Sequence, residues 1–357
     1  MRGAGARGAA LCVVVVVLVL TALGAPGRAA APEPREPGDT RVFSRVLSPG
    51  FPAYVHVHPG NRRVYAGTYT DPNGDAIASR VFEWTRRGAL LRSWEVPGQD
   101  LAEPHGVQVA TSDADGRLVL LEKSTARVLT LDVRTGRFRR VATLPDLEGG
   151  HAIPNYATWG PKGALFVSDY GQPVIWRIPP GGGKPSVWFT DDALASPLGF
   201  GTTGLVFDPA TRSLVISQQS TGAPLDLLRG HLYRLPLRKG GAPGSLETLW
   251  TSGPLDLPDG FGIARSGTIY VALLGTNQIV GISPDGEEVA RFGTPVIGEN
   301  GSPIPFDTPS NATFAGKRLL VANQSALTAT PANHAILDVY VGERGIPMFL
   351  PQGARLR

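Results

Sequence analysis

Cysteine is almost absent from this 357-residue chain. The single cysteine, Cys12, lies in the N-terminal leader. The rest of the chain therefore has no disulfide framework, no zinc–thiolate site and no cysteine nucleophile. The signatures Gly-x-Ser-x-Gly and His-Glu-x-x-His are also missing. Neither a nucleophile-elbow hydrolase nor that class of metalloprotease is predicted.

Charge is sparse and nearly balanced. Charged residues make up 18% of the chain, and the formal net charge is +4. Three arginines, Arg2, Arg7 and Arg28, lie in the leader, and subtracting them from +4 leaves +1. So small a net charge gives no case for binding nucleic acid or a membrane surface. We expect a monomer with a small-molecule partner, no nucleic acid, and no membrane contact beyond the leader.

Long apolar runs are lacking, except for one near the N-terminus. This run extends from Leu11 to Leu23, follows two arginines and precedes the alanines at 29–31. That layout is typical of a secretory signal peptide, and the run is short for a membrane-spanning helix. We predict a signal peptide over residues 1–31, a flexible polar linker over 32–40, and a secreted, extracellular protein. An uncleaved membrane anchor is the alternative.

Glycine and proline are abundant, with 45 and 32 residues, and they mark a repeat of about fifty residues. Each copy has a Pro or Thr, a variable residue, a small residue, an alternating apolar stretch, a tight turn and a second β-rich run. The copies begin at Pro52, Pro104, Pro154, Thr202, Pro258 and Pro309. Six repeats of four-strand length predict an all-β fold, a six-bladed β-propeller with four-stranded blades, over residues 41–357.

The ends of the predicted ring need to be joined, because an isolated sheet edge invites aggregation. The run Val42–Leu47 lies before the first repeat and has the composition of a strand. We predict that it forms the outer strand of the sixth blade.

The variable residue of each repeat departs from the local alternation. The residues two and four positions later are apolar in every copy, as expected for a buried strand face. The variable residue belongs to the same face, yet it is polar in five copies. The predicted inner strands lie near Ala53, His105, Asn155, Thr203, Asp259 and Ser310.

Each of these polar residues fits the simple role of a cap at the start of a strand. In a propeller, however, all six positions surround one axis, where polar groups around a concavity form the usual ligand site. We therefore expect a ligand site at the mouth of the channel.

Three segments resemble the senescence-marker-protein / gluconolactonase / luciferin-regenerating-enzyme family of six-bladed propellers. They are PNYATWGPKG at 154–163, PDGFGIARSG at 258–267 and ILDV at 336–339. The resemblance extends over about residues 50–350. It implies one divalent cation, usually calcium, held by a Glu, an Asn and an Asp on different blades, with a further Asn that contacts the substrate.

Two of these family positions match and two differ. By position, Asp259 matches the Asp that is both ligand and base in the family, and Asn155 matches the substrate-contacting Asn. Ala53 stands where the Glu would be, and Thr203 stands where the ligand Asn would be. A hard cation needs several oxygen ligands, so these two differences weaken a calcium site.

Two functions from different classes follow. The first is an exported, metal-assisted hydrolase of a lactone or related ester, in which Asp259 activates water and His105 is an alternative proton carrier. The second is a non-catalytic propeller that binds a small molecule or a protein at its mouth, which Ala53 and Thr203 favour.

The residues that the first function needs are assigned by position. The predicted metal ligands, with calcium as the cation, are Asp259, Asn155 and Thr203. The predicted substrate contacts are Asn155, Tyr156, Thr203, Ser310 and Asn311. A transition metal held by His105 and Asp259 is a further alternative.

Overall fold

The structure is a computed structural model that describes residues 34–70, 74–197, 199–221 and 228–357. The predicted signal peptide, residues 1–31, lies outside the described residues. Within the described ranges, no helix combines the length and the apolar character needed to cross a membrane.

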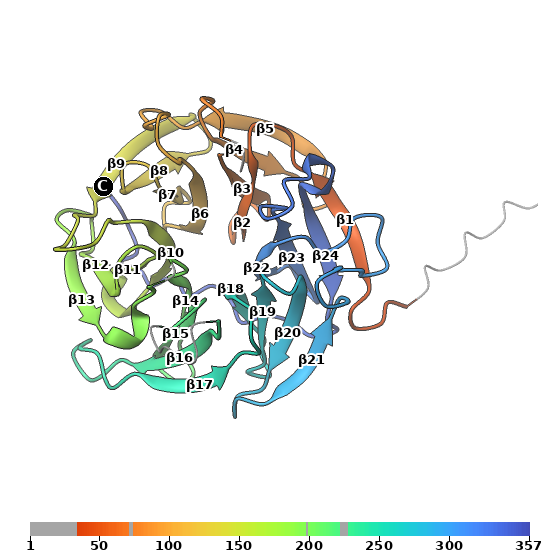
Figure 1. Cartoon of the computed structure of the whole chain (residues 1–357). Coiled ribbons are helices and arrows are strands. Elements are labelled where there is room, and N and C mark those ends of the chain that lie inside the picture. The colour runs from red at the N-terminus through yellow and green to blue at the C-terminus, as the bar shows by residue number, and fades with distance from the viewer. Residues whose placement is uncertain (1–33, 71–73, 198, 222–227) are drawn as a thin grey trace, which may run out of the picture. The chain divides into compact units, whose positions relative to one another are not determined.

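In the described residues, twenty-four strands form six four-stranded antiparallel sheets, arranged as the blades of a propeller (Figure 1). Blade 1 contains β2 (Phe51–Val57), β3 (Val64–Tyr69), β4 (Arg80–Trp84) and β5 (Leu90–Glu95). Blade 2 contains β6 (Val107–Ser112), β7 (Leu118–Glu122), β8 (Arg127–Asp132) and β9 (Arg137–Thr143). Blade 3 contains β10 (Pro154–Trp159), β11 (Leu165–Asp169), β12 (Val174–Ile178) and β13 (Ser186–Thr190).

The remaining blades follow the same order from the axis outward. Blade 4 contains β14 (Thr202–Asp208), β15 (Ser213–Gln218), β16 (His231–Pro236) and β17 (Glu247–Thr251). Blade 5 contains β18 (Pro258–Ile263), β19 (Ile269–Leu273), β20 (Gln278–Ile282) and β21 (Glu288–Phe292). Blade 6 contains β22 (Pro309–Phe314), β23 (Arg318–Asn323), β24 (Ala335–Tyr340) and β1 (Thr40–Arg45). The part of the chain that the structure describes also has three short 3-10 helices: η1 (Pro161–Gly163), η2 (Asp192–Leu194) and η3 (Pro331–Asn333).

The N-terminal strand β1 closes the ring. It pairs antiparallel with β24, with Val42 opposite Leu337. The prediction that this segment forms the outer strand of blade 6 is confirmed. Just before it, Arg35 donates to Asp338 at 2.8 Å and Gly38 donates to the carbonyl of Tyr340 at 2.8 Å. Part of the segment predicted as a linker therefore contacts β24.

The hydrophobic core lies between neighbouring blades. One cluster joins blades 2 and 3 around Trp159 and Trp176, and another joins blades 1 and 6 around Trp84 and Ile336. Because strands alternate their side chains, each of the two inner strands buries residues against both neighbouring sheets. The blades are thus held around the axis by apolar contact.

Strand direction sorts the loops onto two faces. All six inner strands begin at the same end of the channel, and the strands of each blade alternate in direction. We call this end the mouth face; it carries the loops between second and third strands and the loops between blades. The opposite end, the back face, carries the loops between first and second strands and between third and fourth strands.

Candidate functional site

The inner strands carry β-bulges next to the variable residue of the repeat. In five of the six blades the pairing with the second strand shifts at this point. The shifts lie between Ala53 and Val55, Pro154 and Ala157, Thr202 and Leu205, Pro258 and Phe261, and Pro309 and Asn311. A bulge re-aims side chains locally. The variable residue therefore need not point toward the buried apolar face of its strand.

One hydroxyl group joins three blades at the axis. The Tyr54 hydroxyl lies 2.8 Å from Asn155 Oδ1 and 2.8 Å from Asp259 Oδ1. Tyr54 comes from blade 1, Asn155 from blade 3 and Asp259 from blade 5. A phenol has a single proton, and both partner oxygens are acceptors, so Tyr54 donates to one of them at a time. We call these residues the axial triad.

The backbone places Tyr54 in this position. Its φ is +49°, in the left-handed region that non-glycine residues seldom adopt. The facing Gly260 leaves space for the ring, because a Cβ there would lie 3.0 Å from Tyr54 Cε1 and 2.6 Å from Asn311 Cβ. The sequence analysis did not assign Tyr54 to the site, since the conformation of a bulge residue is not visible in the repeat pattern.

Burial sets the proton chemistry of Asp259. The carboxyl is 5% exposed, and its removal from water raises its pKa to about 7. Hydrogen bonds from Tyr54 and from the Gly260 N–H act in the opposite direction and lower this pKa. Burial and the charge of Asp259 raise the pKa of Tyr54 well above its usual value. Near neutral pH, Asp259 can therefore exchange a proton while Tyr54 keeps its own.

Below the triad lies a second tyrosine and then a cavity. The Tyr156 ring is 4.7 Å from the Tyr54 ring, measured between centroids. Tyr156 also lines a cavity of about 370 Å³ in the back half of the channel, which the C-terminal residues 346–349 help to enclose. Asp259, Tyr54, Tyr156 and the cavity thus follow one another by contact along the axis.

Two more tyrosines, Tyr69 and Tyr170, lie near the triad on the mouth face. Tyr69 ends β3 and Tyr170 follows β11 directly. Burial raises the pKa of both, and the charge of Asp259 adds to each rise. The Tyr170 hydroxyl donates to Gln219 at 2.9 Å. The sequence analysis missed these residues, although the end of each second strand lies beside the start of the first.

Three other predicted site residues, Thr203, Asn311 and Ser310, are buried within or between the inner strands. Thr203 Oγ1 bonds Ser217 Oγ at 2.9 Å and the Pro258 carbonyl at 3.2 Å. Asn311 accepts from the Val55 N–H at 3.1 Å and is fully buried. Ser310 Oγ is buried, without a hydrogen-bond partner among the described residues. The structure does not bring these three side chains into hydrogen-bond contact with the axial triad.

His105 lies apart from the triad. It precedes β6, and its Nε2 is 2.8 Å from the Ile77 carbonyl while its Nδ1 is 3.0 Å from the Glu103 carbonyl. In blade 2 the bulge comes later, between Val109 and Thr111, so His105 stays in the loop before the strand. The imidazole therefore joins loops of blades 1 and 2.

The residues around Asp259 do not fit the calcium ligand set. Calcium takes six to eight oxygen ligands. Ala53 offers no side-chain oxygen, the Thr203 hydroxyl is bonded elsewhere, and the Tyr54 hydroxyl lies between Asn155 and Asp259. Over the described ranges, no cluster of three His, Cys, Asp or Glu residues could hold a metal ion. This donor set fits a shared proton better than a divalent cation.

Comparisons with known proteins support the fold and a family. The profile of the SMP-30/Gluconolactonase/LRE-like region matches residues 73–320. No curated protein matches the sequence significantly.

Three solved structures share the fold at low identity. Regucalcin from Agrobacterium tumefaciens, a calcium-binding protein, is 18% identical, with a TM-score of 0.61 over 87% of this chain and 97% of that one. A gluconolactonase from Xanthomonas campestris is 19% identical, with a TM-score of 0.57 over 84% and 88%. Virginiamycin B lyase from Staphylococcus aureus is 14% identical, with a TM-score of 0.54 over 81% and 80%. The structural similarity establishes a common fold. At such low identities it does not identify the reaction, which has to be argued from the residues of the site.

Proposed function

Because the chain belongs to the SMP-30/gluconolactonase/LRE-like family, we propose that it is a lactonase-type hydrolase with Asp259 as its general base. The observation that carries the proposal is the buried Asp259 carboxyl, with a pKa of about 7, bonded to Tyr54 at the axis. A base with a pKa near the working pH is the most effective in proton transfer.

The proposed reaction uses Asp259, Tyr54 and Asn155. Ionised Asp259 accepts a proton from water, and the water oxygen attacks the lactone carbonyl carbon, whose π electrons move onto the carbonyl oxygen. Collapse of this tetrahedral species breaks the ring C–O bond, and the proton on Asp259 passes to the leaving oxygen to give a hydroxy acid. In this proposal the hydrogen bond from Tyr54 holds the carboxylate, and the Asn155 amide nitrogen is the group assigned to donate to the carbonyl oxygen.

In this chain the hydrolysis needs no calcium ion held by Asp259, Asn155 and Thr203. The proposal is supported by the position of the Tyr54 hydroxyl between two of these residues. A ligand that binds only the folded state raises its melting temperature. Calcium should therefore leave the melting temperature unchanged, and a chelator should leave lactone hydrolysis unchanged. A calcium-dependent rise that disappears in Asp259→Asn would contradict this proposal.

The base assignment is tested with a panel of γ- and δ-lactones. Asp259→Asn should reduce kcat/KM by about 10²- to 10⁴-fold, the usual contribution of a positioned base. Tyr54→Phe removes a hydrogen bond that lowers the pKa of Asp259, so the acid limb of its pH–rate profile should move to higher pH. The control, Asp192→Asn, makes the same charge change at an exposed site of the mouth face and should retain activity.

Two results would count against the proposal. If Asp259→Asn hydrolyses lactones at the rate of the unchanged protein, Asp259 is not the base. If the unchanged protein hydrolyses no lactone in the panel, the non-catalytic binding propeller becomes the better interpretation. We also propose that residues 1–31 direct export. Expression of the full chain should then give protein outside the cell from which this leader has been removed.

A further inference from the structure

Exposed basic residues collect on the back face of the propeller. Every blade contributes at least one exposed Lys or Arg from its back-face loops. One from each blade, in chain order, is Arg87, Arg134, Lys162, Arg238, Arg265 and Lys317. Of these six, only Arg134 has an ion-pair partner among the described residues, Asp132. The same face also has exposed carboxylates, which are fewer than its exposed Lys and Arg side chains: Asp115, Asp285 and Glu287 in its loops, and Glu36 and Asp39 before β1. Its exposed charge is therefore positive on balance.

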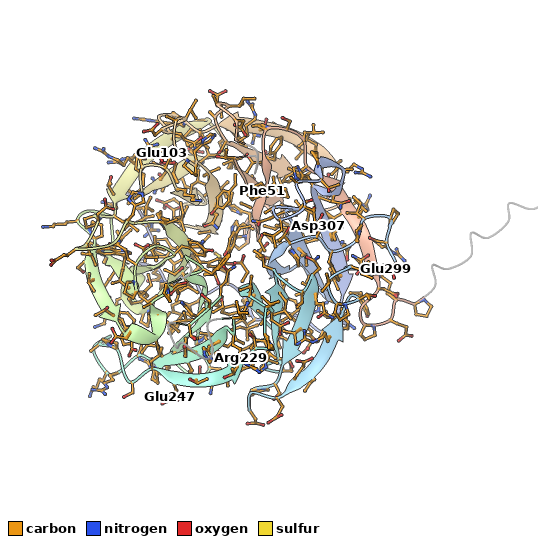
Figure 2. All side chains as sticks on the ribbon, in the orientation of Figure 1. Phe51, Glu103, Arg229, Glu247, Glu299 and Asp307 are labelled. Carbon is orange, nitrogen blue, oxygen red and sulfur yellow. The ribbon has the colours of Figure 1, made fainter. Side chains whose placement is uncertain are left out.

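The mouth face has the opposite charge. Its exposed acidic side chains are Asp100, Glu103, Asp146, Glu148, Asp192 and Glu299. None of the described residues in the mouth-face loops is an exposed Lys or Arg. Figure 2 shows Glu103 and Glu299 on well-separated parts of the ring. The small net charge of the chain is thus the sum of two faces of opposite sign.

Large apolar side chains are also unevenly placed. The exposed ones in loops, such as Leu47, Leu255 and Ile297, belong to the mouth face. In the described back-face loops no large hydrophobic residue is exposed. Any partner of the back face is consequently held by charge, without insertion of apolar side chains.

We propose that the back face binds the surface of an anionic lipid bilayer. The basic residues come from loops of all six blades, spread around the ring seen in Figure 1. A flat layer of negative headgroups can meet all of them together, whereas a linear polyanion reaches only those along its track. Each Lys or Arg near such a surface adds to the attraction, which salt screens. Bound in this way, the mouth faces away from the lipid and stays open to soluble molecules.

The test is co-sedimentation of the full chain with two kinds of vesicle. One is phosphatidylcholine alone, which measures any binding by the apolar leader, and the other contains one third phosphatidylserine. The back-face variant is Arg238→Glu with Lys239→Glu, both exposed. The matched control is Arg139→Glu with Arg140→Glu, two exposed residues of the outer strand β9 at the ring's edge.

We expect binding to the phosphatidylserine vesicles above the phosphatidylcholine level, loss of this binding at high salt, and at least about tenfold weaker binding of the back-face variant. The edge control should bind within about twofold of the unchanged chain. Equal binding to both vesicles, or equal loss in both variants, would overturn the proposal. Binding to a sulfated polysaccharide but not to vesicles would overturn it too, in favour of a linear polyanion.

Discussion

Tyr54 connects three blades through a single side chain, at some cost in backbone energy. A left-handed φ at a non-glycine residue costs about 1–2 kcal/mol. The conformation is stabilised by the hydroxyl's contacts with Asn155 and Asp259 and by the tilted packing of the ring against Tyr156. Strained backbone that surrounding contacts maintain is a common property of functional sites. The residue type could be read from the sequence, but the left-handed bulge that turns Tyr54 toward the axis could not.

Asp259 should make the stability of the protein depend on pH. Its folded pKa of about 7 lies above its usual value of 3.8, so the fold disfavours the ionised form. Stability is therefore full below pH 4, falls as the pH rises, and is lowered by about 4 kcal/mol above pH 7. Asp259→Asn removes this titration and should melt at a higher temperature than the unchanged protein at pH 8, with a much smaller difference at pH 5.

Thermal melts at the two pH values measure this difference. Asp192→Asn is the control, because it removes one exposed carboxylate from the same face. It should follow the pH dependence of the unchanged protein. A constant offset between Asp259→Asn and the unchanged protein across this pH range would contradict the raised pKa.

At the scale of the strand, the repeat phrase predicted the blades because apolar alternation and turn residues are local signals. The outer strand of blade 6 was predicted as 42–47 and is observed as Thr40–Arg45. The alternation did not predict the orientation of the variable polar residue in each repeat. Asn155 reaches the axis, Thr203 bonds the neighbouring inner strand, and His105 stays in a loop. The bulge of blade 2 comes later than the others, which accounts for His105, whereas the bulges of blades 3 and 4 lie at equivalent positions. Asn155 and Thr203 therefore differ through their side chains and neighbours.

Asn311 should stabilise the junction between the last blade and the first. Its side chain accepts from the Val55 N–H and donates to Thr313 Oγ1 at 2.8 Å. Asn311→Ala leaves a buried N–H without its partner, which costs about 1–3 kcal/mol. Urea unfolding should show this loss with an unchanged m-value. The control is Asn61→Ala, at an exposed turn. If Asn311→Ala lowers the free energy of unfolding no more than Asn61→Ala does, Asn311 does not stabilise the junction.

At the scale of the whole molecule, net charge proved a poor guide to surface charge. The expectation of no membrane contact depended on a value near +1 for the chain without its leader. That value conceals a separation of charge, because successive loops of a propeller alternate between its two faces and the basic and acidic residues lie mostly in different loops. The sign of each face is therefore readable from the sequence only after the strands have been assigned in order.

The C-terminal tail should hold the back of the channel closed. Residues 346–349 line the cavity, the Phe349 ring packs against Phe207 with 4.7 Å between centroids, and Leu356 is fully buried beside blades 2 and 3. Burial of a large apolar side chain contributes about 1.5–3 kcal/mol, and each kcal/mol moves the melting temperature of a domain of this size by about 2–4 °C. Deletion of residues 346–357 should lower the melting temperature by about 10 °C and increase binding of a hydrophobic dye, because the cavity opens.

The control is Gln352→Ala, at an exposed position of the same tail, which should change neither the melting temperature nor the dye binding. A truncated chain that melts like the full one, with no added dye binding, would show that the blades close the channel unaided.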